Sequence, residues 1–145
     1  MHRALILAGL LALVVGCSAS STTAPAVSSL DITGTWTGTV SFQNISAKMT
    51  WQLTETGSNV TGPVTIALSN GTVLLNGFLT GSLPGSSLSY TVAVGAGGIP
   101  TQPTCVGQLS GTMAATASTL SGSFGVASSS CTVPLATTSV TLTKS

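Results

Sequence analysis

The sequence predicts an all-β fold, an eight-stranded antiparallel up-and-down β-barrel, with a β-sandwich as the alternative. From residue 30 onward, apolar residues alternate with Ser and Thr at a period of two in eight short segments. Turn residues separate most of these segments at spacings that suit antiparallel neighbours. No stretch of ten residues carries a helical stripe, because Gly, Thr and β-branched residues are too frequent.

The expected strands follow one another along the chain. In the first two, Trp36 and Trp51 alternate with Thr, Lys and Gln. The expected ranges are 35–42, 48–54, 60–68, 72–83, 88–94, 105–113, 120–126 and a last strand around 140–142. The segment 72–83 alternates poorly, which predicts burial on both faces or a bulge. The gap 95–104 contains three Gly, one Ala and two Pro, and we expect a long loop there.

A five-residue pattern recurs in these strands: an apolar residue, Ser or Thr, Gly, a polar residue or Pro, and a second apolar residue. Its copies are 32–36, 60–64, 79–83, 109–113 and 120–124. Since the first, third and fifth residues share a face, each Gly is expected to point inward between two larger side chains. A strand without a Cβ at that point can coil sharply, which is how a small barrel closes.

The N-terminal segment has the organisation of an export signal. Met1-His2-Arg3 is followed by an apolar run, 4–15, that is too short to cross about 30 Å of hydrocarbon as a helix. Val14-Val15-Gly16-Cys17 resembles the lipobox of bacterial lipoproteins. That resemblance implies a signal peptide at 1–16 and a Cys17 thiol that receives diacylglycerol and starts the mature protein. The protein would then attach to the membrane through N-terminal acyl chains.

Residues 17–29 are expected to comprise the lipidated Cys17 and a tether, 18–29, and residues 30–145 the folded domain. The tether is rich in Ser, Thr and Ala, contains one Pro and shows no periodicity, which is typical of a flexible linker. Ser18, and not Asp, follows Cys17. The resemblance to lipoproteins of Gram-negative enteric bacteria then implies sorting to the outer membrane of the cell envelope.

A second resemblance concerns the folded domain. Thr33-Gly34-Thr35-Trp36, together with the repeated Thr-Gly and Ser-Gly strands, looks like avidin and streptavidin, and more loosely like the lipocalins with their Gly-x-Trp start. It implies a barrel whose mouth holds a small ligand. The biotin-binding residues do not carry over, because Thr37-Gly38-Thr39 stands where that family has Asn and Ser. Lipocalins also brace their Trp with a late Arg, and no Arg follows Arg3 here.

The charge inventory excludes several classes of function. The chain has three basic and two acidic residues and a net charge of +1, so it lacks the basic stripe of a nucleic-acid binder. The sole His is His2, inside the expected signal peptide, which leaves no imidazole for acid–base chemistry or metal ligation. Asp31 and Glu55 are far apart in sequence and would have to converge to act as a pair. We expect no enzyme, metal or cofactor.

The number of Cys residues predicts a disulfide. Of the three Cys, lipid is expected to take Cys17, which leaves Cys105 and Cys131 in an oxidising compartment. The two flank one predicted hairpin. Odd residues face inward on its first strand and even residues on its second, so Cys131 must lie in the loop or beyond a bulge to reach Cys105.

Two functional hypotheses follow for the barrel. The first is a non-catalytic surface lipoprotein that serves as a structural or interaction module. The second is a binder of a small apolar ligand inside the barrel. The candidate interior contacts are Trp36, Trp51, Tyr90 and Phe124, which fit the inward phase and would otherwise fill the core. Among the aromatic residues of the domain, Phe78 alone does not fit that phase.

Overall fold

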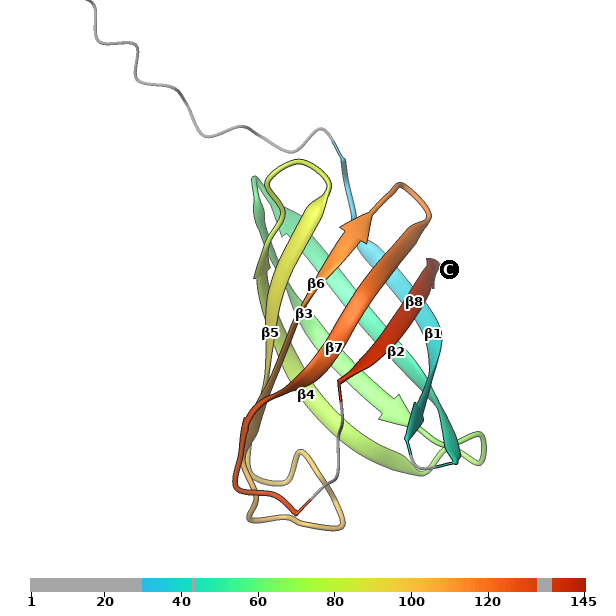
Figure 1. The fold of residues 1–145 in the computed structure, drawn as a ribbon, viewed down its shortest axis with the longest axis vertical. Helices are drawn as coiled ribbons and strands as arrows, with labels where there is room; N and C mark the ends of the chain where they lie inside the picture. Colours follow the sequence, from blue (N-terminus) through green and yellow to red (C-terminus); the bar gives the residue numbers. More distant parts are fainter. Residues whose placement is uncertain (1–29, 43, 133–136) are drawn as a thin grey trace, which may run out of the picture.

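The computed structural model describes residues 30–42, 44–132 and 137–145 (Figure 1). Eight strands follow each other around a closed barrel, every strand antiparallel to the next, and the last pairs with the first. They are β1 (Gly34–Phe42), β2 (Ile45–Thr56), β3 (Asn59–Ala67), β4 (Val73–Ser82), β5 (Ser87–Val94), β6 (Gly107–Ala115), β7 (Thr119–Ser129) and β8 (Thr138–Lys144). The up-and-down barrel predicted from the sequence is therefore confirmed, and the β-sandwich alternative is excluded.

A bulge explains the poor alternation of β4. Ile66 pairs with Leu75, but the next residue of β3, Ala67, pairs with Val73, which leaves Leu74 as an extra residue. The extra residue shifts the inward phase, so that Leu74 and Leu75 both pack on the core, whereas Phe78 lies on the outward face of the regular part of the strand. Of the two expectations for this segment, burial on both faces or a bulge, the bulge is confirmed.

The five-residue pattern places its apolar residues inside the barrel. All ten first and fifth positions are buried: Ile32, Trp36, Val60, Val64, Leu79, Leu83, Leu109, Met113, Leu120 and Phe124. They belong to a single hydrophobic cluster that runs the length of the barrel. The burial follows from strand geometry, because alternate residues of a closed sheet face its interior.

The central glycines of the pattern lie where neighbouring backbones approach closely. A Cβ at Gly62 would collide with the carbonyl oxygen of Gln52, and one at Gly111 with that of Ser123. At both points the regular cross-strand pairing is interrupted. The absence of a side chain thus allows β3 and β6 to coil tightly against their neighbours.

The up-and-down topology gives the barrel two distinct ends (Figure 1). The chain enters β1 at the N-terminal end, which also contains the short turns 57–58, 83–86 and 116–118. The opposite end, called the loop end below, contains turn 68–72, the long loop 95–106 that joins β5 to β6, and the segment 130–132 after β7. Loop 95–106 agrees with the predicted loop at 95–104.

Candidate functional site

At the N-terminal end, Trp36 closes the barrel from within. Its indole nitrogen Nε1 donates a hydrogen bond of 2.7 Å to the carbonyl oxygen of Ile32. The Ile32 amide in turn donates to a carboxylate oxygen of Glu55 at 2.9 Å. Trp36 and Ile32 have no exposed surface, so this end is filled by side chains whose polar atoms are partnered.

Lys144 covers the same tryptophan from outside. Its ammonium nitrogen lies 5.5 Å from the centroid of the Trp36 ring and donates to the carbonyl oxygen of Asp31 at 3.3 Å. This position is within the range of a cation–π interaction. Lys144 continues the inward phase of Val140 and Leu142 at the rim of the barrel. Lys144, near the C-terminus, therefore packs on Trp36 of the first strand in a chain that has no Arg after Arg3. This contact was not predicted from the sequence.

The two carboxylates, of Asp31 and Glu55, lie at the same end of the barrel. The hydrogen bond from the Ile32 amide to Glu55 joins residues that are 23 positions apart in sequence. Asp31 accepts the Thr33 amide at 2.8 Å, and the Glu55 amide donates to the Thr33 hydroxyl at 3.0 Å. The Thr33 amide and hydroxyl, with a smaller contribution from Lys144, lower the pKa of Asp31 below its ordinary value. Within the described residues, no group of three or more His, Cys, Asp or Glu could hold a metal ion.

The four candidate interior contacts all lie in the buried core. Trp51 sits beside Trp36 across β1 and β2, and its ring meets the ring of Tyr90 edge to face, with centroids 5.0 Å apart. The Tyr90 hydroxyl donates to the Ser123 carbonyl at 2.7 Å, where the pairing of β6 and β7 is interrupted. Burial raises the pKa of this phenol well above its ordinary value. Phe124 is 1% exposed.

Little free space lies among these residues. Trp36 and Trp51 are fully buried and pack in the hydrophobic core. The Trp51 indole nitrogen has no hydrogen-bond partner within the described part of the chain. A cavity of about 20 Å³ lies instead at the loop end, next to Ile99, which is room for about one water molecule. Its lining residues are Leu75, Val94, Ile99, Gly107, Gln108, Leu109, Val126, Ser128, Ser129 and Cys131.

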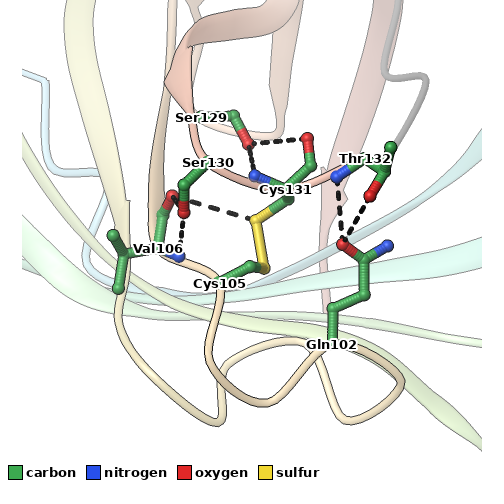
Figure 2. The surroundings of a disulfide bond; sticks show 7 residues. All are labelled: Gln102, Cys105, Val106, Ser129, Ser130, Cys131 and Thr132. Atoms are coloured by element: carbon green, nitrogen blue, oxygen red, sulfur yellow. Dashed lines mark hydrogen bonds between the residues drawn. A yellow bond between two sulfur atoms is a disulfide. The ribbon is translucent and has the colours of Figure 1, made fainter.

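The loop end is held by the predicted disulfide (Figure 2). Cys105 and Cys131 are bonded, with their Cα atoms 5.0 Å apart. Cys131 lies past the end of β7 and beyond a bulge at Ala127, in agreement with the parity argument. Gln102 of the long loop accepts hydrogen bonds from the amide of Thr132 at 3.0 Å and from its hydroxyl at 3.4 Å.

A buried side chain of the long loop fills the mouth of the barrel at this end. Ile99 is 5% exposed and packs on the core. The Asn76 amide of β4 donates to the carbonyl oxygen of the adjacent Gly98 at 2.7 Å, which ties the loop to the rim. The sequence analysis predicted the loop but not this role of Ile99.

Cys17, the expected lipidation site, and the expected tether lie outside the described residues. In the part of the chain that the structure describes, no helix has the length and hydrophobicity needed to cross a membrane. Comparison with known protein families, with curated proteins and with solved structures found no match to this chain. The fold and side-chain geometry therefore define a class only: a closed eight-stranded antiparallel β-barrel with a packed interior.

Proposed function

We propose that this chain is a non-catalytic lipoprotein of the bacterial cell envelope, anchored in the outer membrane by acyl chains on Cys17. Its barrel would serve as a structural or interaction module outside the bilayer. The observation that carries the anchor is the sequence Val14-Val15-Gly16-Cys17 after a short apolar run. Acyl chains on one residue supply the membrane affinity that a domain with four charged residues lacks.

The packing of the barrel supports a module over a ligand carrier. A small-molecule site usually has a volume of about 300 to 1,000 Å³, whereas the cavity at the loop end measures about 20 Å³. The alternative, a small apolar ligand inside the barrel, would require Trp36, Trp51, Tyr90 or Phe124 to move out of a filled core. Such rearrangements cost free energy that the ligand would have to supply.

The hydrogen bonds that the two carboxylates accept support a non-catalytic role. Asp31 and Glu55 each accept a backbone amide at the N-terminal end, which is a structural use of a carboxylate. The mature chain would also contain no His to act as a base for its many hydroxyl groups.

The proposal also predicts how the barrel is oriented. Because the chain enters at the N-terminal end, a tether of 12 residues, 18–29, places that end toward the membrane. Fully extended, such a tether reaches about 40 Å, and as a flexible coil about 20 Å. The tether therefore attaches the anchor to the N-terminal end and keeps that end within this reach of the bilayer, while the loop end with its disulfide lies at the opposite end of the barrel.

Lipidation can be tested in a diderm bacterial host. We expect the wild-type protein to incorporate an alkyne-labelled fatty acid and to fractionate with the outer membrane. Cys17→Ala should abolish the label and release the protein from membranes, whereas the control Ser20→Ala should behave as wild type. Ser18→Asp should move the labelled protein to the inner membrane. A Cys17→Ala variant that stays membrane-bound would overturn the proposal.

A further inference from the structure

We propose that the outer face of the barrel at the loop end binds an uncharged saccharide. This inference names a partner for the interaction module and so rests on the proposed function. The observations that carry it are an exposed aromatic ring, an open hollow beside it, and the absence of charge over five strands.

The ring belongs to a row of outward residues that crosses β3 to β7. Cross-strand pairing places Pro63 beside Phe78, Phe78 beside Ala93, Ala93 beside Gln108, and Gln108 beside Ser128. All five positions are exposed. Because each residue sits on a strand of a closed barrel, the row is held in place before any partner binds, which reduces the entropic cost of binding.

Phe78 supplies the flat apolar contact in this row. It is 52% exposed, whereas Trp36, Trp51, Tyr90 and Phe124 are buried. The face of an aromatic ring carries partial negative charge and attracts weakly positive C–H groups. A sugar ring presents such C–H groups on its faces and hydroxyl groups around its edge, so it can stack on Phe78 and remain hydrogen-bonded at its rim.

The row runs into an open hollow between β5, β6 and β7. The hollow is shallow and largely open to solvent, and the space within it measures about 560 Å³. The lining residues are Ala93, Val106, Gly107, Gln108, Ser128, Ser129 and Ser130. Small side chains form much of the lining, and the Gln108 amide and Ser128 hydroxyl make no side-chain hydrogen bond to another described residue, so both are available to a ligand.

The rim of the hollow is rigid. The Ser130 hydroxyl accepts the Val106 amide at 3.0 Å, and the Ser130 amide donates to the Val106 carbonyl at 2.9 Å. The disulfide joins the residues next to this pair, Cys105 and Cys131 (Figure 2). The Val106 side chain points away from the disulfide in Figure 2 and is 48% exposed, which adds a second apolar contact to the hollow.

The charge distribution decides which class of partner fits. The sequence has no Asp, Glu, Lys, Arg or His between Glu55 and Lys144, so β3 to β7 carry no charged side chain. A phosphate, a uronate or an amine would lose hydration here without meeting an opposite charge. A purely apolar partner would leave Gln108 and Ser128 without hydrogen bonds. A neutral saccharide carries no charge that would lose hydration, and its hydroxyl groups can form hydrogen bonds with Gln108 and Ser128.

The test is binding of the purified full-length lipoprotein, in detergent, to immobilised oligosaccharides. The probes are neutral oligomers of glucose, galactose, mannose and N-acetylglucosamine, beside oligomers that contain uronic or sialic acids. We expect retention on one or more of the neutral oligomers and no preference for the acidic ones. Absence of binding to every neutral probe, or stronger binding to the acidic probes, would overturn the proposal.

Matched variants locate the site. Phe78→Ala should weaken binding tenfold or more, while Ile45→Ala, which removes a side chain of equal exposure (51%) outside the row, should leave it unchanged. Gln108→Ala should weaken binding, and Gln52→Ala, also exposed but on β2, should not. Thermal unfolding of each variant must match wild type. Equal losses in Phe78→Ala and Ile45→Ala would show that this row is not the binding site.

The two proposals fail separately. Cys17→Ala removes the acyl anchor and should leave saccharide binding unchanged, because Cys17 is outside the barrel. If the protein is lipidated but binds no neutral oligosaccharide, only the saccharide proposal is wrong. If the wild-type protein from the diderm host carries no acyl chain but still binds neutral oligosaccharides through Phe78 and Gln108, the anchor is wrong and the binding site stands.

Discussion

The N-terminal end of the barrel is closed by noncovalent contacts between strand residues and the segment before β1, whereas the loop end is closed by a loop and a covalent cross-link. At the first end, the Trp36 indole donates to the Ile32 carbonyl, and the Lys144 ammonium lies over the Trp36 ring and donates to the Asp31 carbonyl. At the second, Ile99 fills the mouth, and the disulfide of Cys105 and Cys131 holds the segments around it.

The difference follows from the lengths of the connections. The turns at the N-terminal end are short hairpins, whose closure orders few residues. The loop end must order loop 95–106 as well as residues 130–132 after β7, and each ordered residue costs conformational entropy. A disulfide reduces that cost by restricting the unfolded chain. Covalent closure is therefore found where the connections are long.

The largest effect is expected from removal of the tryptophan at the N-terminal end. Trp36→Ala should lower the free energy of unfolding by about 3 to 5 kcal/mol, because it leaves a cavity in a filled core and deprives the Ile32 carbonyl of its donor. Denaturant unfolding measures the loss. The exposed control Phe78→Ala should change stability by less than about 0.5 kcal/mol. Equal stabilities of the two variants would mean that Trp36 does not close the barrel.

Removal of the disulfide tests the other end. The double variant Cys105→Ser, Cys131→Ser opens a cross-link of sequence separation 26, for which the chain-entropy model gives about 3 to 4 kcal/mol. Amide hydrogen exchange should become faster in loop 95–106 through local opening, whereas amides around Trp36 should become faster only by as much as global stability falls. A larger acceleration around Trp36 than that fall would show that the two ends are closed together and not independently.

Alkylation tests whether Cys105 and Cys131 are bonded in the isolated protein. In denatured, unreduced protein, neither Cys105 nor Cys131 should react with an alkylating reagent, and both should react after reduction. Alkylation of both residues without reductant would exclude the disulfide in the isolated protein.

The smallest effect is expected from Lys144. Lys144→Met keeps the apolar stem but removes the ammonium group over Trp36, and it should lower the free energy of unfolding by about 0.5 to 1 kcal/mol. Lys48→Met is the matched control, because Lys48 is also exposed and lies on β2, away from this tryptophan. Urea unfolding of the two variants measures the difference. If Lys48→Met costs as much as Lys144→Met, the contact with Trp36 contributes nothing.

Several features of the structure could be predicted from the sequence because they depend on neighbours along the chain. Alternation at a period of two located all eight strands and the inward face of most. The same parity set Phe78 apart from the inward aromatic residues and required Cys131 to lie in the loop or beyond a bulge, and in the structure it lies past β7 and beyond a bulge. These predictions succeed because a strand exposes alternate side chains to opposite faces whatever its partners are.

Other features were decided only by the closure of the barrel. The residues at which the bulges form (Leu74 and Ala127), the position of Lys144 over Trp36, and the row from Pro63 to Ser128 all depend on which residue of one strand lies beside which residue of the next. A sequence pattern of period two does not specify that register, since a shift by two residues keeps every side chain on its face. Register is set when eight coiled strands must meet edge to edge around one packed core, and this requirement exists only in the tertiary structure.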